Sequence, residues 1–106
     1  NEGQINETES ISAGLDYPGV SPIHCFLKDT KRARYTSASD EDALKAYQLV
    51  SKLENISPSL EPSHAFAEAI RIAPKLNSSE VIIVNSCGDS LKDKDIIKQK
   101  LGSYIR

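Results

Sequence analysis

The chain has 106 residues, of which 39% are apolar and 26% charged, with a formal net charge of −2. This predicts one soluble globular domain with no electrostatic basis for binding nucleic acid, and no apolar run approaches the roughly 20 residues that cross a membrane. Two cysteines without paired spacing, Cys25 and Cys87, favour a reducing, cytoplasmic environment over a disulfide framework.

The amino-terminal stretch lacks the pattern of a regular element. Residues 1–10, NEGQINETES, are polar and acidic without a hydrophobic period, so we expect them to be disordered. The next ten residues, ISAGLDYPGV, carry so many turn-forming residues that an irregular loop is expected. A short helix or a turn should follow around His24, because Pro22 stands where a proline favours the start of a helix.

The clearest element that the sequence predicts is a helix over residues 40–54. Ser39 or Asp40 is a good N-cap, and the acidic residues that follow suit the positive end of the helix dipole. Apolar residues then recur at helical spacing: Ala43, Ala46, Tyr47, Val50 and Leu53. Asn55 is expected to close this helix.

Two further helices and three strands complete the expected fold. The helices should span residues 61–73 and 92–101, each with an apolar stripe or a recognisable end signal. Short runs of strand-forming residues predict strands at residues 33–38, 56–60 and 81–84. The alternation of strand and helix predicts an α/β fold with a small parallel three-stranded sheet, flanking helices and exposed sheet edges.

The candidate site lies where the last expected strand ends. Ser86, Cys87 and Gly88 belong, with Asn85, to the polar turn after that strand, and ligands of open α/β sheets gather at the carboxyl ends of strands. Cys87 is either a thiol activated by the helix start downstream or an inert buried residue. Glu61 is equally consistent with a carboxylate at a helix N-terminus and with one that faces a ligand.

The remaining chemistry-bearing residues have simpler interpretations. From its Gly- and Pro-rich surroundings alone, Asp16 is typical of a turn aspartate. His24 and His64 are each more typical of structural, hydrogen-bonded histidines than of ligands, and their spacing does not favour zinc. Four lysines are typical of a solvated helix face: Lys92, Lys94, Lys98 and Lys100.

Three stretches together resemble one enzyme family. They are SISAGLDYPGVSPIH, then ARYTSASDEDALKAYQLVSKLENISPSLEPSHAFAEAI, then VIIVNSCGD with KDKDI. In this order they are similar to the carboxyl-terminal part of the tryptophan synthase β subunit, which belongs to the fold type II pyridoxal-phosphate enzymes. The resemblance covers about residues 3–101, and residues 11–101 form the family segment of a single domain 1–106.

The resemblance implies an activity and partners for a parent protein. The family uses pyridoxal phosphate as an electron sink to replace the hydroxyl of L-serine with indole, which gives L-tryptophan and water. It implies three protein partners: the rest of the β subunit, a tryptophan synthase α subunit or fused α domain, and a second β chain in a homodimer. Nucleic acid and membrane are not among the implied partners.

The resemblance also implies roles for residues at the cofactor. Cys87 matches the serine that hydrogen-bonds the pyridine nitrogen, and a thiol is a weaker donor than a hydroxyl. Ser86 and Gly88 flank it in the same cofactor-binding turn. Glu61 matches the glutamate of the family's ALESSHA motif, which lies near the cofactor ring and is taken as catalytic.

A second group of residues matches the substrate loop and a cation site. Asp16 matches an aspartate that engages the substrate and helps to close the site. The backbone carbonyls of Tyr17 and Gly19 match two ligands of a monovalent cation. The chain departs from the family at Pro62, which replaces a serine, and at residues 88–92, where the loop is about two residues longer and lacks an arginine.

Two features of the family are missing from these 106 residues: the lysine that holds the cofactor covalently and the glycine-rich cup for its phosphate. We therefore expect the segment alone to be inactive. Two alternatives stay open. One is an interaction or regulatory module derived from this enzyme, and the other is a different fold type II lyase or dehydratase, which the cysteine at position 87 favours.

Overall fold

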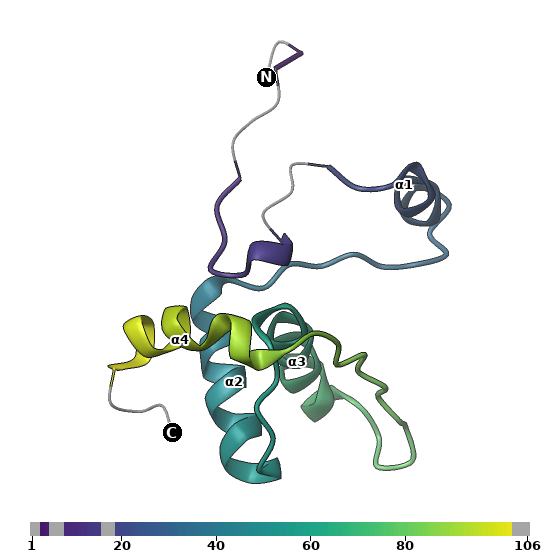
Figure 1. Ribbon diagram of the computed structural model, residues 1–106. Coiled ribbons are helices and arrows are strands. Elements are labelled where there is room, and N and C mark those ends of the chain that lie inside the picture. Colours follow the sequence, from purple (N-terminus) through teal and green to yellow (C-terminus); the bar gives the residue numbers. More distant parts are fainter. Residues whose placement is uncertain (1–2, 5–7, 16–18, 103–106) are drawn as a thin grey trace. The chain divides into compact units, whose positions relative to one another are not determined.

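The computed structural model describes residues 3–4, 8–15 and 19–102. The chain divides into two compact units, Asn1–Thr36 and Ser37–Arg106. The regular elements in the described residues of both units are helical (Figure 1).

The first unit contains the short 3-10 helix η1, Ala13–Leu15, and the helix α1, Pro22–Asp29. The Ser21 side chain accepts a hydrogen bond from the backbone N–H of Ile23 at 3.2 Å, so the expected proline-led start of α1 is confirmed with a serine cap before it. The helix is tied to the segment that follows it, because His24 Nδ1 and the Tyr35 hydroxyl share a hydrogen bond of 2.7 Å.

The second unit is built on α2, Asp40–Glu54, which begins and ends at the predicted residues. Ser39 and Asp42 form a reciprocal capping box, in which the Asp42 N–H donates to Ser39 Oγ at 3.1 Å. Asn55 ends the helix in the left-handed conformation, at φ 55°. Local signals of this kind are carried by neighbouring residues, which is why the bounds could be predicted.

Helix α3, Leu60–Ile72, packs against α2 and continues into the 3-10 turn η2, Ala73–Lys75. After an extended stretch, the 3-10 turn η3, Ser90–Asp93, leads into α4, Lys94–Leu101, which ends at Gly102. These two helices confirm the expected helices at 61–73 and 92–101. Among the described residues, the buried apolar side chains are Ala43, Ala46, Tyr47, Val50, Leu60 and Ile97.

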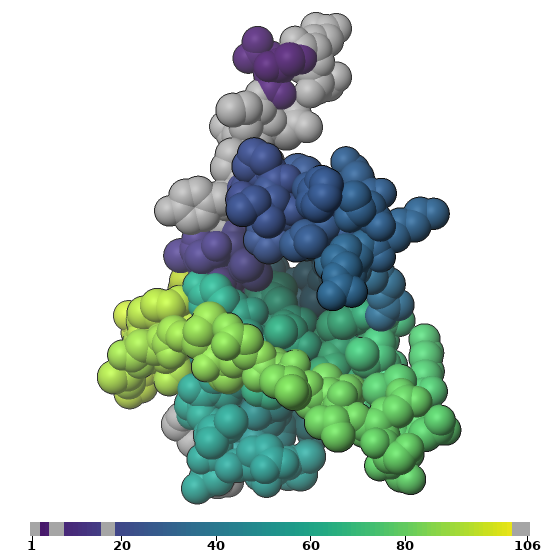
Figure 2. Space-filling view, turned by 90° about the vertical axis from the view of Figure 1, so that its right-hand side faces the viewer, coloured from purple at the N-terminus to yellow at the C-terminus, as the bar shows by residue number. Residues whose placement is uncertain are grey.

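The predicted three-stranded parallel sheet is wrong for this chain. Residues 33–38, 56–60 and 81–84 contain no strand in the structure, and Leu60 is instead the first residue of α3. Pro58 has no N–H to donate, and a lone extended segment has no neighbour to complete a ladder. The run after α3 projects from the helices (Figures 1 and 2), with Val81 83% and Ile83 91% exposed.

The apolar run at residues 81–84 predicted a buried strand, but no strand forms there, and Val81 and Ile83 are mostly exposed. Among the residues that the structure describes, no helix is long and apolar enough to cross a membrane.

Candidate functional site

Ser59 joins the start of α3 to the turn that follows residues 81–84. Its hydroxyl donates to the backbone carbonyl of Cys87 at 2.7 Å, and the residue is 2% exposed. Gly88 has φ +85°, and a Cβ there would lie 2.8 Å from Ser59 Oγ. A glycine is therefore required at position 88 both by the backbone conformation and by the close approach of the serine.

Asp93 supplies the cap that α3 does not obtain from its own N-cap residue. The side chain of Ser59 makes no capping bond, whereas the backbone N–H of Leu60 donates to Asp93 Oδ2 at 2.8 Å. The Asp93 side chain is nearly buried, at 3% exposed. A carboxylate in this place satisfies an unpaired donor of the first turn and complements the positive end of the helix dipole.

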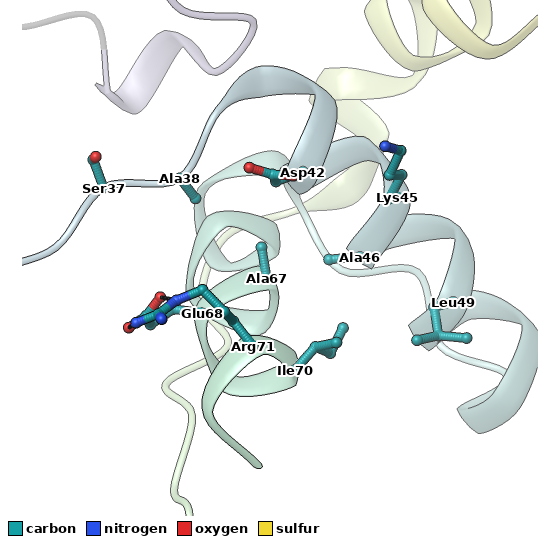
Figure 3. A pocket seen from close by; sticks show the side chains of 10 residues that line it. All are labelled: Ser37, Ala38, Asp42, Lys45, Ala46, Leu49, Ala67, Glu68, Ile70 and Arg71. Atoms are coloured by element: carbon teal, nitrogen blue, oxygen red, sulfur yellow. Dashed lines mark hydrogen bonds and ion pairs between the residues drawn. The ribbon is translucent and has the colours of Figure 1, made fainter. Parts of the chain in front are cut away.

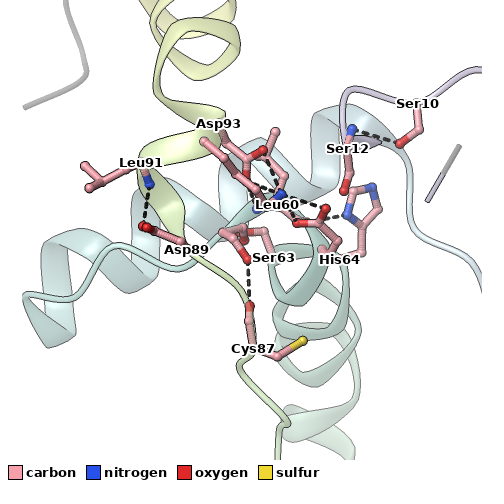
Figure 4. A network of polar contacts seen from close by, with 12 residues as sticks. Ser10, Ser12, Leu60, Ser63, His64, Cys87, Asp89, Leu91 and Asp93 are labelled. Carbon is pink, nitrogen blue, oxygen red and sulfur yellow. Dashed lines mark hydrogen bonds and ion pairs between the residues drawn. The ribbon is translucent and has the colours of Figure 1, made fainter. Parts of the chain in front are cut away.

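The polar groups of the first turn of α3 are satisfied further by side chains of that turn. The Ser63 hydroxyl donates to the Ser59 carbonyl at 2.7 Å, and His64 Nδ1 lies 2.7 Å from the Leu60 carbonyl oxygen. Figure 4 shows Leu60, Ser63 and His64 near the start of α3, together with Cys87 and Asp93. The start of α3 is thus the centre of a hydrogen-bonded polar cluster, formed by residues of α3, η3 and the turn at Cys87.

Lys92 carries the positive charge of this cluster. Its ammonium nitrogen lies 2.7 and 2.8 Å from the two carboxylate oxygens of Glu61, and 3.0 Å from Asp93 Oδ1. The hydrogen bond to Glu61, followed by the bond to Asp93, raises the pKa of Lys92 above its ordinary value, although partial burial opposes the shift. The two carboxylates are thereby neutralised in part by one ammonium.

The structure links Glu61 to the turn at Cys87 and Gly88 through Lys92, which binds Glu61 and whose Cε lies 3.8 Å from a Cβ built at Gly88. Ser86 is the chain neighbour of Cys87. Cys87 is a free, exposed cysteine, so the prediction of an inert buried residue does not apply to it. Asp16 and Tyr17 lie outside the described residues. Gly19 is exposed in the first unit, with nothing within 4 Å of a Cβ built there.

Sequence reasoning missed three residues of the cluster: Ser59, Lys92 and Asp93. Lys92 was expected on a solvated helix face, but it pairs with a carboxylate 31 positions away. Ser59 precedes an acidic residue and a proline, a pattern that indicates an N-cap, so its place before α3 could have been found. No local signal indicates that its hydroxyl bonds the Cys87 carbonyl.

His24 and His64 both make hydrogen bonds, as expected of structural histidines. His24 pairs with Tyr35, and His64 Nε2 also lies 3.8 Å from Asp40 Oδ1. No group of three or more His, Cys, Asp or Glu residues able to hold a metal ion occurs in the described part of the chain.

A separate cavity of about 290 Å³ lies between α2 and α3 (Figure 3). Its floor is apolar, and the Glu68 carboxylate and Arg71 guanidinium pair at its rim, which raises the pKa of Arg71. None of its lining residues belongs to the cluster at the start of α3. They are Ser37, Ala38, Asp42, Lys45, Ala46, Leu49, Ala67, Glu68, Ile70 and Arg71.

Comparison with known proteins identifies relatives along nearly the whole chain. The tryptophan synthase beta chains of Cereibacter sphaeroides and Roseobacter denitrificans are each 52% identical to it over 101 residues, and that of Allorhizobium ampelinum is 48% identical over the same length. Each match covers 95% of this chain and 25% of the relative. The chain therefore spans about a quarter of the length of these relatives. No family model matches it.

Proposed function

We propose a function from one premise: the chain belongs to the tryptophan synthase beta chain family, as a carboxyl-terminal segment. The whole protein would then replace the hydroxyl of L-serine with indole to form L-tryptophan and water, with pyridoxal phosphate as cofactor. The observation that carries this proposal is the 52% sequence identity with two tryptophan synthase beta chains along 95% of this chain.

The described residues suit one edge of such a cofactor. Cys87 is exposed, and its backbone is held by Ser59, so its thiol is available to a group from outside the described residues. A thiol is a weak donor that can face a ring nitrogen, and the Glu61 carboxylate lies at the same end of α3. In our proposal these groups face the ring edge, and a phosphate-binding loop comes from elsewhere in the protein.

When bound, pyridoxal phosphate supplies an electron sink for bond breaking at the amino acid. In our proposal, Cys87 binds and orients the ring through its nitrogen, with Ser86 and Gly88 shaping the turn around it. Glu61 places a negative charge beside the ring. The segment alone is inactive, because it contributes only this wall.

Several finer roles belong to the same proposal. Asp16 engages the substrate, and the backbone carbonyls of Tyr17 and Gly19 bind a monovalent cation. The protein partners are the rest of the beta chain, an alpha subunit or fused alpha domain, and a second beta chain. The protein acts in the cytoplasm, in keeping with two free cysteines in its described residues.

The test uses the full-length protein that contains this segment, supplied with pyridoxal phosphate, L-serine and indole. We expect tryptophan to form, and a matched protein that lacks residues 80–102 to form none. Pyruvate from serine without tryptophan would instead support a dehydratase, which the cysteine in place of a serine favours. A protein that binds no cofactor and forms neither product would overturn the enzyme proposal in favour of an interaction module.

A further inference from the structure

Lys92 is held from two sides at the start of α3. Its ammonium bridges both oxygens of Glu61 and also contacts both oxygens of Asp93, at 3.0 and 3.3 Å. Asp93 is itself fixed, because it is nearly buried and accepts the Leu60 N–H. The Lys92 ammonium therefore binds the fixed carboxylate of Asp93 and the carboxylate of Glu61 at the same time.

We infer that Lys92 is a positioning residue, which holds the Glu61 carboxylate in a fixed place at the wall of the cofactor site and supplies its counter-charge. This inference rests on the proposed function, and it assigns a role to a residue that the sequence placed on a solvated surface. In this role Lys92 acts through Glu61.

Electrostatics favours this role over that of a solvated ion pair. Two carboxylates, of Glu61 and Asp93, lie within 3.3 Å of the same nitrogen, and without a cation their charges would repel. Glu61 has a side chain only 20% exposed, so water screens it less than a surface glutamate. Loss of the ammonium would remove the positive charge that Lys92 places between these two carboxylates.

Geometry supports the same conclusion. Both Glu61 oxygens are engaged by one nitrogen, which restricts rotation of the carboxylate about its last bond. The 3-10 turn η3 delivers Lys92 to this place, and its start is fixed by the Leu91 N–H, which donates to Asp89 at 2.9 Å. The backbone position of Lys92 is thus set by the ordered turn η3.

Other titratable groups near the start of α3 must be separated from Glu61 in any test. They are Asp93 and Asp89 on the η3 side, His64 with its neighbour Asp40, and the Cys87 thiol. A change that arises from Glu61 should disappear when Glu61 is replaced by glutamine, whereas a change from the other groups should persist.

The experiment compares four forms of the full-length protein: wild type, Lys92→Met, Lys92→Arg and Lys98→Met. Lys98 is an exposed lysine of α4 and serves as the matched control. Two readouts are recorded against pH: kcat for tryptophan formation, and the absorption band of the bound cofactor without substrate. For Lys92→Met we expect the acid limb of both curves to move to higher pH, with KM nearly unchanged.

Lys92→Arg should restore the wild-type curves, because it keeps the charge, and Lys98→Met should match wild type. In a Glu61→Gln background, Lys92→Met should cause no further shift. If Lys92→Met does not fold, Lys92→Gln takes its place. Coincident curves for wild type and a folded Lys92 variant, or a shift that persists without Glu61, would overturn the inference. A wild type that makes no tryptophan would overturn the proposed function first.

Discussion

The carboxylate of Asp93 caps the backbone N–H of Leu60 at 2.8 Å, across 33 positions of sequence. This one bond fixes the beginning of α3 to the 3-10 turn η3. It also sets where Lys92, the preceding residue, can place its ammonium. The arrangement of the candidate site therefore depends on a helix cap supplied from a distance.

Replacing this cap should destabilise the fold. We expect Asp93→Ala to lower the free energy of unfolding by about 1–2 kcal/mol, because the Leu60 N–H loses its acceptor. Asp93→Asn keeps an acceptor and should lose less. Urea unfolding followed by circular dichroism measures both, with the exposed Asp95 changed to Ala as control. Equal losses for Asp93→Ala and Asp95→Ala would contradict a capping role.

Gly88 should not tolerate a side chain. We expect Gly88→Ala to cost about 1–3 kcal/mol in the free energy of unfolding, because it combines a left-handed backbone with a clash on Ser59 Oγ. Gly19→Ala is the matched control, since a Cβ there meets nothing within 4 Å. The double variant Ser59→Ala with Gly88→Ala should cost less than the sum of the single changes. Strict additivity would show that the clash is relieved in another way.

The stability supplied by Lys92 should vanish at alkaline pH. Its pKa is raised in the folded state, so the ion pair contributes fully below the ordinary lysine value of 10.5 and is lost as pH rises through the folded value. The difference in unfolding midpoint between wild type and Lys92→Met should therefore shrink above about pH 10.5. Urea titrations from pH 8 upward in buffers of one ionic strength measure it. A difference that stays constant over this range would argue against the ion pair.

The thiol of Cys87 should be replaceable by a hydroxyl. In the full-length protein, we expect Cys87→Ser to keep or raise the rate of tryptophan formation, because a hydroxyl is the stronger hydrogen-bond donor. Cys25→Ser, at an exposed cysteine of α1, is the control for the loss of a thiol elsewhere. A large loss of rate confined to Cys87→Ser would show that the thiol has a role of its own.

Helices were predictable here because their signals are local. The capping residues, the periodic alanines and Asn55 of α2 all lie within one stretch, so residues 40–54 could be assigned from the sequence. Strands could not be predicted in the same way, because a strand exists only where a second backbone completes its hydrogen bonds. Val81 and Ile83 have the residue types of a buried strand but remain mostly exposed in this chain.

The sequence by itself was enough to predict the helices and the family resemblance, and to identify Glu61 and Cys87 as candidate site residues. Only the tertiary structure showed that Ser59 ties the Cys87 turn to α3, and that Lys92 bridges Glu61 and Asp93. The reason is physical: the Ser59–Cys87 and Lys92–Glu61 contacts join residues 28 and 31 positions apart, and the residue types at their ends carry no local pattern. The sequence alone does not distinguish a solvated lysine from one that, like Lys92, pairs with a carboxylate distant in the chain.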